Sequence, residues 1–500
     1  MRCSRWATVS PTEDRAARTS GVIRLVVVGV AAALVAAVLG AWPSATSSTF
    51  PAALAEPSCG PGALKETSTD GRVPSSDYSS GRYKQGYRCN TSLVAHQGKT
   101  GGFKVHRYVD ATGRACAFYD STLLFPKDTL MQAVSGLGVV VLDMSKPSAP
   151  VKTAQLTSPA MLSPHESLLL NPKRGILAAE LGNPATNVSV LDLHDVRTDC
   201  RHPKLLSSTP TGGLGHESGF APDGRTFYIT GTGGNTLQAV DVSDPTKPKV
   251  LFTEYGVNYH GVRVSNDGRR LYVANIGNST GGSFASGGLR ILDVGQIQDR
   301  EPDPSVPVLS SLSWPEGSIP QAAEPFTRNG HQYLLEFDEF ANYSAEGGVT
   351  QASSPVGAAR IIQVDDPRHP TVVSDIRLAV HQPAARQGEQ QNDPGASSPV
   401  QGYAAHYCSV PTRTNPNLVA CSMILSGLRV FDIRDVTHPK QVGYFNQPVA
   451  QGDNPLVLTS QGAFAMSQPA WDPTHDSVWY SDGNSGFYNV RLTNGLEKLF

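Results

Sequence analysis

The chain contains 500 residues, of which 39% are hydrophobic and 17% charged, and its formal net charge is −2. Because it has no excess of positive charge to gather phosphates, a nucleic-acid-binding function is excluded. The 48 glycines and 37 prolines are typical of a globular, turn-rich chain rather than a helical or disordered one.

The first 55 residues have the pattern of an export segment. An apolar run from Leu25 to Trp42 follows a flank that carries Arg2, Arg5, Arg15, Arg18 and Arg24. The length of this run lies between that of a signal-peptide core and that of a spanning helix, and Ala53-Leu54-Ala55 offers a cleavage site before Glu56. We expect residues 1–55 to be a cleaved signal peptide or a retained membrane anchor. The rest is then extracytoplasmic, either secreted or anchored to the cell membrane by this segment alone.

Six of the seven cysteines follow the apolar run, namely Cys59, Cys89, Cys116, Cys200, Cys408 and Cys421. An even number of cysteines in an oxidising compartment favours disulfides, although six cysteines allow 15 pairings. We expect one pair in particular. Cys408 and Cys421 flank the turn-rich stretch Pro411 to Pro416 between two predicted strands, so a bridge across that hairpin is natural. The other pairings stay open.

After a linker and N-terminal extension at residues 56–90, the chain repeats an apolar run that ends in aspartate, at intervals of about 50 to 70 residues. The runs end at Asp143, Asp192, Asp241, Asp293, Asp365 and Asp432. A proline-rich turn and a second apolar strand follow each aspartate, whose carboxylate can accept turn amides. A hairpin precedes it, as in the strand–Asn-Asp-Gly–strand pattern around Gly268. Each unit therefore predicts four antiparallel strands.

These repeats predict an all-β, seven-bladed β-propeller over residues 91–500. The first blade begins near Phe103, with Cys116 to Tyr119 as its second strand, and a seventh unit from Gln468 to Leu492 lacks a clear outer strand. The segment from Thr91 to His96 resembles the outer strands elsewhere. We expect it to complete the last blade and close the ring, which removes exposed strand edges.

The Asp-x-Ser-x-Pro-x-x-Pro turns after Asp143 and Asp241, together with the apolar runs, resemble the bacterial LVIVD-repeat family. The resemblance covers most of residues 91–492 and implies a β-propeller, but no particular activity, because propellers host unrelated functions. Two kinds of departure are visible. The turn is shortened after Asp365, and it is lengthened in the second and sixth units.

Histidine recurs at one position of the repeat, just before the first strand of four units, as His165, His216, His260 and His406. The first strand of every propeller blade lines the central channel, so these imidazoles can converge and bind copper or zinc. His106 is a fifth candidate of uncertain register. The alternative is that each histidine only hydrogen-bonds to a neighbouring strand or to channel water.

A metal in this channel would resemble, distantly, the histidine-lined copper sites of selenium-binding-protein-type thiol oxidases. That resemblance rests on architecture and inward histidines, without a shared motif. Glu166 and Glu217 follow two of the histidines, but adjacent strand residues point to opposite faces. Asp338-Glu339 and Asp482-Gly483-Asn484 supply too few oxygens for calcium, so we interpret them as solvated turns.

Two functions follow from these patterns. The first is an interaction scaffold at the cell surface, with no chemistry of its own, that binds an extracytoplasmic protein, glycan or small ligand. Its contacts would use two long insertions, Asn275 to Gly288 and His381 to Tyr403, with Tyr343 and Tyr403 as anchors. The alternative is that both insertions are plain solvated linkers. The second is a metal-dependent oxidoreductase with its centre at the four histidines.

Overall fold

The computed structural model describes residues 50–121, 136–181, 189–213, 215–231, 235–277, 287–314, 319–339, 356–394, 396, 402–448 and 462–500. These belong to one compact unit, Phe50–Phe500, which is described by itself. The expected export segment and its apolar run lie outside the described residues. Among the helices described, none combines the length and apolar character needed to cross a membrane.

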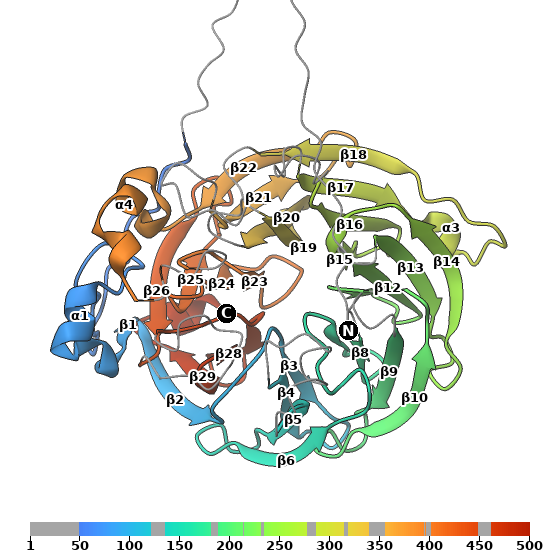
Figure 1. The fold of residues 1–500 in the computed structure, drawn as a ribbon, viewed down its shortest axis with the longest axis horizontal. Helices are drawn as coiled ribbons and strands as arrows, with labels where there is room; N and C mark the ends of the chain where they lie inside the picture. Colours follow the sequence, from blue (N-terminus) through green and yellow to red (C-terminus); the bar gives the residue numbers. More distant parts are fainter. Residues whose placement is uncertain are drawn as a thin grey trace, which may run out of the picture. The chain divides into compact units, whose positions relative to one another are not determined.

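The described chain folds into seven antiparallel sheets arranged as the blades of a ring, with the inner strands toward the centre (Figure 1). Blades one to three run β3 (Val105–Val109), β4 (Ala115–Asp120), β5 (Val139–Asp143), β6 (Val151–Leu156); β7 (Leu168–Asn171), β8 (Ile176–Glu180), β9 (Val190–Asp195), β10 (Lys204–Pro210); and β11 (Gly219–Phe220), β12 (Thr226–Gly231), β13 (Thr236–Asp241), β14 (Lys249–Tyr255). The first blade begins where the sequence predicted.

Blades four to seven complete the ring. They run β15 (Tyr259–Val264), β16 (Arg270–Asn275), β17 (Gly288–Asp293), β18 (Val308–Ser313); β19 (Ile319–Arg328), β20 (His331–Glu339), β21 (Ala359–Gln363), β22 (Thr371–Ile376); β23 (Tyr407–Ser409), β24 (Leu418–Ser422), β25 (Leu428–Asp432), β26 (Lys440–Asn446); and β27 (Ala470–Asp472), β28 (Ser477–Asp482), β29 (Gly486–Leu492). Outside the sheets, the described residues form three short α-helices, α1 (Ser75–Ser80), α3 (Gly295–Gln298) and α4 (Pro383–Gln387). The predicted seven-bladed propeller is confirmed.

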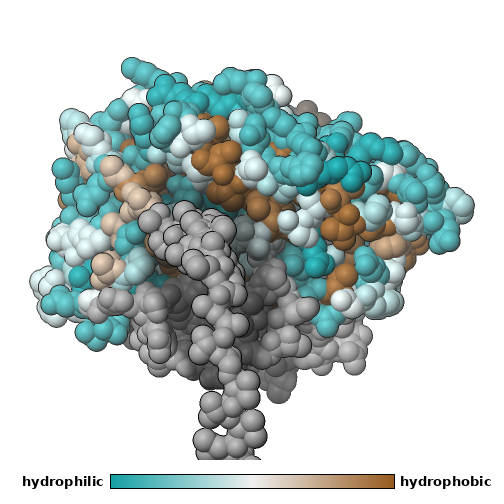
Figure 2. All heavy atoms as spheres, turned by 90° about the horizontal axis from the view of Figure 1, so that it is seen from above, coloured by the Kyte–Doolittle hydropathy of each residue, from teal (hydrophilic) through white to brown (hydrophobic). Residues whose placement is uncertain are grey.

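The blades stack face to face, so their middle strands are buried on both faces and read as continuous apolar runs. In β5 the residues from Val139 to Leu142 are all buried. The outer strands lie on the rim, where Figure 2 shows hydrophobic side chains as separate patches among hydrophilic ones. Exposed aliphatic side chains fall one to a blade on six outer strands, at Leu93, Val151, Leu205, Val250, Val308 and Val372.

The aspartate of the repeat ends the third strand of a blade by accepting the amide two residues ahead. Asp143 Oδ1 accepts from the Ser145 amide at 2.8 Å, and Asp241 Oδ1 from that of Ser243 at 2.9 Å. In blade two, Asp195 makes this contact with the amide of Arg197 at 2.8 Å, whereas Asp192 is buried and accepts from Ala160. The end of this strand was therefore predicted three residues too early, at Asp192 in place of Asp195.

Blade five also departs from the predicted register. Its strand β21 ends at Gln363, which pairs with Thr371 as Asp241 pairs with Lys249 in blade three. Asp365 instead accepts from the Gln332 amide. With Gln363 at the aspartate position, the turn of blade five is not shortened, and the turn of blade six between Asp432 and Lys440 is not lengthened, so both of those predictions were wrong.

The N-terminal strand closes the ring as predicted. The strand β2 (Thr91–Gln97) pairs antiparallel with β29 and supplies the outer strand of blade seven. A further strand, β1 (Tyr87–Cys89), pairs with β26 and makes blade six five-stranded. The extension that the sequence presented as a linker is thus part of the sheet structure.

The structure contains three disulfides, Cys59–Cys89, Cys116–Cys200 and Cys408–Cys421. Cys408 and Cys421 stand directly opposite each other on β23 and β24. The first bridge lies within the N-terminal extension, and the second joins β4 of blade one to the turn between β9 and β10 of blade two. Three disulfides among six cysteines suggest an oxidising, extracytoplasmic environment.

The insertion after His381 packs on the N-terminal extension. The Arg72 guanidinium donates to Asp393 at 2.7 Å, and the Tyr403 hydroxyl contacts both Asp393 and the backbone of Val73. Tyr403 is therefore buried rather than an exposed anchor. Tyr343 and residues 278–286 of the other insertion lie outside the described residues.

A candidate metal centre in the central channel

The four histidines of the shared register come together at one end of the channel. The ring centroids of His165 and His216 are 4.7 Å apart, and those of His216 and His260 are 4.6 Å apart. His406 joins them from blade six through the carboxylates described below. The Phe103 ring of blade one lies against His165 and His406, with centroid distances of 4.4 and 5.5 Å.

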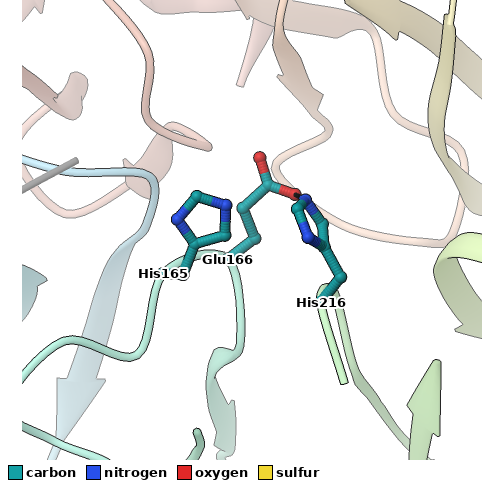
Figure 3. A group of neighbouring side chains, drawn as sticks. All are labelled: His165, Glu166 and His216. Carbon is teal, nitrogen blue, oxygen red and sulfur yellow. Dashed lines mark ion pairs between the residues drawn. The ribbon is translucent and has the colours of Figure 1, made fainter. Parts of the chain in front are cut away.

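Glu166 is the centre of the cluster. Its Oε2 lies 3.1 Å from His216 Nε2 and 3.5 Å from His260 Nε2, and its Oε1 lies 3.3 Å from His406 Nε2. Figure 3 shows its carboxyl group reaching between His165 and His216. In a regular strand, His165 and Glu166 would point to opposite faces, so Glu166 was not expected here. However, His165 precedes β7 and has a left-handed φ of 52°. The turn at His165 lets both His165 and Glu166 face the channel.

A second carboxylate reaches the cluster from blade five. Glu339, the last residue of β20, places Oε1 3.4 Å from His260 Nε2 and Oε2 3.1 Å from His406 Nε2. Glu339, Asp338 and Asp482 are all buried, so the interpretation of these acidic segments as solvated turns was wrong. Asp338 instead pairs with Arg360 at 2.7 Å.

The backbone fixes the orientation of two imidazoles. His260 Nδ1 lies 2.9 Å from the Pro320 carbonyl oxygen, and His406 Nδ1 lies 2.6 Å from that of Met466. With Nδ1–H donating to the backbone, Nε2 faces the two carboxylates. Metal-ligating histidines are held in the same way, with one ring nitrogen on a hydrogen-bond acceptor and the other on the metal.

The charge of the cluster is reflected in the pKa values of its members. Burial lowers the pKa of both His260 and His406, but the Glu166 and Glu339 carboxylates outweigh it and raise each pKa to about 9. Burial and the neighbouring His216 hold the pKa of His165 well below its ordinary value. Two buried carboxylates therefore require a compensating positive charge, from two imidazolium protons or from a cation.

The spacing of the donor atoms suits a first-row metal. Two ligands about 2.1 Å from one ion, in tetrahedral or octahedral geometry, stand roughly 3.0 to 3.5 Å apart. The N–O distances from Glu166 and Glu339 to the three imidazoles run from 3.1 to 3.5 Å. Within the described residues, two groups have donor atoms within 4.8 Å of one another: His165, Glu166 and His216; and Glu166, Glu339 and His406.

A layer of buried polar side chains lies next to the cluster in the channel. Gln321 Nε2 donates to Glu166 Oε2 at 2.6 Å and to the Tyr407 hydroxyl at 2.7 Å. Beside them the fully buried Lys104 places Nζ 2.8 Å from Glu217 Oε1 and 3.7 Å from the centre of the Tyr407 ring. Glu217 is thus engaged with Lys104 in this layer, whereas Glu166 reaches the histidines.

Glycine follows His260 because Glu217 occupies the space that a side chain would need. A Cβ at Gly261 would lie 2.2 Å from Glu217 Oε2 and 2.2 Å from the Gln321 carbonyl oxygen. The fifth candidate, His106, does not join the cluster, since its Nε2 lies 2.8 Å from the Leu168 carbonyl oxygen. Burial lowers the pKa of His106 to about 4, so it is neutral.

The comparison with known families finds one match, in the third blade. The family described as LVIVD repeat matches residues 227–254, which cover β13 and all but one residue each of β12 and β14 in blade three. No curated protein matches the chain.

Several solved structures resemble the chain at low identity. A protein from Lactobacillus plantarum is 12% identical with a TM-score of 0.49, over 74% of this chain and 89% of its own. The periplasmic gluconolactonase of Pseudomonas aeruginosa is 13% identical with a TM-score of 0.49, over 71% and 87%. Hydrazine synthase of Kuenenia stuttgartiensis is 13% identical with a TM-score of 0.47, over 80% and 97%. The chain is a seven-bladed β-propeller whose third blade matches the LVIVD repeat.

Proposed function

We propose that this protein is an exported metal-binding propeller, whose central channel holds a divalent first-row transition metal such as copper or zinc. The observation that supports the proposal is the convergence of three imidazole Nε2 atoms on Glu166 and Glu339. His165, His216, His260, His406, Glu166 and Glu339 would hold the ion. Imidazole with carboxylate is a donor set that suits zinc, copper, iron and nickel.

Charge balance favours a dication at this position. Glu166 and Glu339 bring two negative charges into a site where His260 and His406 are nearly inaccessible to solvent. A dication cancels these charges and displaces the imidazolium protons, which is the usual coupling between metal binding and proton release. A bound ion would supply Lewis acidity or, in the case of copper, one-electron redox chemistry.

The protein's own residues would prepare the site. The Pro320 and Met466 carbonyls orient two imidazoles, and Gln321 holds one oxygen of Glu166. The Phe103 ring covers His165 and His406 on the blade-one side and keeps that side apolar. An oxidoreductase would depend on this ion, whereas an interaction scaffold would keep its fold and its partner without it.

The first prediction concerns metal content. We expect the exported protein, purified without chelator, to contain a stoichiometric first-row metal by elemental mass spectrometry. His406→Ala removes an imidazole, and Glu339→Gln removes a charge while keeping the side-chain shape, so both should reduce metal occupancy by about tenfold or more.

A matched control is His438→Ala, because the His438 side chain is 79% exposed on an outer turn and pairs only with surface groups. Its metal content should equal that of the wild type. A wild-type protein that stays metal-free after incubation with copper, zinc, iron and manganese would refute the proposal. So would retention of full occupancy by Glu339→Gln.

A further inference from the structure

A cavity lies in the central channel, away from the candidate metal centre. It has a volume of about 340 Å³, and its lining includes Arg263, Arg413 and Glu324 together with Leu169 and Phe220. His260 is near the start of β15, whereas Arg263 is near its end. Because a strand advances about 3.3 Å per residue, the cavity lies toward the opposite mouth of the channel from the histidines.

A row of alternating charges leads from the polar layer to this cavity. Lys104 contacts Glu217 at 2.8 Å, and Glu217 contacts Arg263 at 2.7 Å. Arg263 then contacts Glu324 at 3.0 Å, and Glu324 contacts Arg413 at 2.8 Å. The row begins and ends on a cation, so its cavity end presents a positive charge to a ligand.

Arg413 is the cation at the cavity end of the row. Its Nε donates to Glu324 and its Nη1 to the Val264 carbonyl at 3.1 Å, while its Nη2 makes no hydrogen bond to the described part of the chain. The side chain is 33% exposed, in contrast to the buried Arg263. Lys173, on the exposed turn after β7, adds another positive charge to the lining.

Apart from His106, Asn171 and Gln468, the rest of the lining is apolar. Leu169, Phe220 and Val264 line the cavity, with the prolines Pro172 and Pro222 beside them. A volume of about 340 Å³ lies at the lower end of the range of roughly 300 to 1,000 Å³ that is common for small-molecule sites. A guanidinium beside an apolar wall recognises a planar carboxylate on an apolar body.

We propose that this cavity binds a small organic carboxylate, with its carboxylate on Arg413 and its apolar body against Phe220 and Leu169. The site is separate from the metal centre, because Glu217 and Lys104 lie between them. Binding therefore does not require a metal.

Benzoate is a suitable probe, and benzamide is its neutral control of nearly the same shape. We expect isothermal titration calorimetry of the chelator-treated protein at low salt to show benzoate binding about tenfold tighter than benzamide. Arg413→Gln should weaken benzoate binding by about tenfold and leave benzamide unchanged. Lys173→Gln, on an exposed turn, should weaken benzoate binding by roughly threefold.

Arg434→Gln is the matched control, since Arg434 pairs with Asp432 on an outer turn of blade six. This variant should bind benzoate as the wild type does. Equal affinity for benzoate and benzamide would overturn the proposal. Undiminished binding by both Arg413→Gln and Lys173→Gln would do the same. So would inorganic phosphate binding in place of benzoate, or no benzoate binding up to about 10 mM. None of these outcomes bears on the metal content.

Discussion

Glu180 is a buried acid close to the candidate metal centre, at the end of β8. One hydrogen bond to it is found among the described residues, from the Gly215 amide to Oε1 at 3.3 Å. Burial raises the pKa of Glu180 from 4.5 to about 8. The folded protein therefore keeps a proton on this carboxyl at pH values where the unfolded chain has released it.

Because of this proton, Glu180 makes the stability of the fold depend on pH. The stability that the protonated Glu180 contributes is fully present below pH 4.5. It is lost as the pH rises to about 8, because charging the buried carboxyl opposes folding. Glu180→Gln keeps the hydrogen bond to Gly215 without an ionisable group. Between pH 5 and pH 8, we expect the free energy of unfolding of this variant to fall less than that of the wild type. The difference between the two falls should be a few kcal/mol at most.

Urea denaturation across this pH range measures the effect. Glu301→Gln changes an exposed glutamate and should reproduce the pH dependence of the wild type. Parallel pH profiles for wild type and Glu180→Gln would contradict the prediction.

Site residues could be predicted from the sequence where they occupy the same position in several repeats. The four histidines share one register, and the structure brings all four together. Glu166 was uncertain because alternation in a strand does not anticipate the left-handed turn at His165. Glu339 comes from the far end of a second strand, where no repeated pattern marks it, so only the three-dimensional arrangement reveals it.

Among the larger elements, the N-terminal extension is attached to blade six by a buried ion cluster. Arg429 on β25 contacts Asp70 at 3.2 Å and also pairs with Glu66, while its guanidinium lies 4.6 Å from the centre of the Tyr444 ring. Arg429 is fully buried, and Glu66 and Asp70 are nearly so. The extension therefore contributes charge that the blade itself needs.

Arg429→Met should destabilise the protein by about 3 to 5 kcal/mol, because it leaves two buried carboxylates without their cation. Chemical denaturation measures this change. Arg491→Met removes an exposed arginine on β29 and should alter the free energy of unfolding by less than about 0.5 kcal/mol. A loss of under about 1 kcal/mol in Arg429→Met would show that the cluster does not hold the extension.

Strands were easier to predict than their exact registers. Apolar runs and proline turns identify the blades, but in blade two Asp192 and Asp195 both follow apolar residues. Only the pairing of Asp195 with Lys204 decides which of them ends the strand. The fifth strand of blade six was not predicted, because β1 is three residues long and depends on β26 and the Cys59–Cys89 bridge.

At the scale of the whole molecule, β2 protects the edge of the last blade. A chain that begins at residue 98 lacks β2 and exposes the hydrogen-bonding edge of β29. Such an edge pairs with other chains, so we expect this truncation to self-associate in size-exclusion chromatography with light scattering. A chain that begins at Asn90 also lacks the extension and β1, which exposes the edge of β26, but it keeps β2 and should self-associate less than the shorter chain. Monomeric behaviour of both chains would contradict this role for β2.

The pairing of β2 with β29 also sets an order of assembly. During synthesis β2 is among the first strands made and β29 is the last, so blade seven cannot form until the chain is almost complete. Loop-closure entropy makes such a long-range contact slow to form, whereas β3 to β6 can pair as soon as they exist. The nascent protein must therefore keep one strand unpaired while six blades form around it, and the ring becomes a cooperative unit only in its final step.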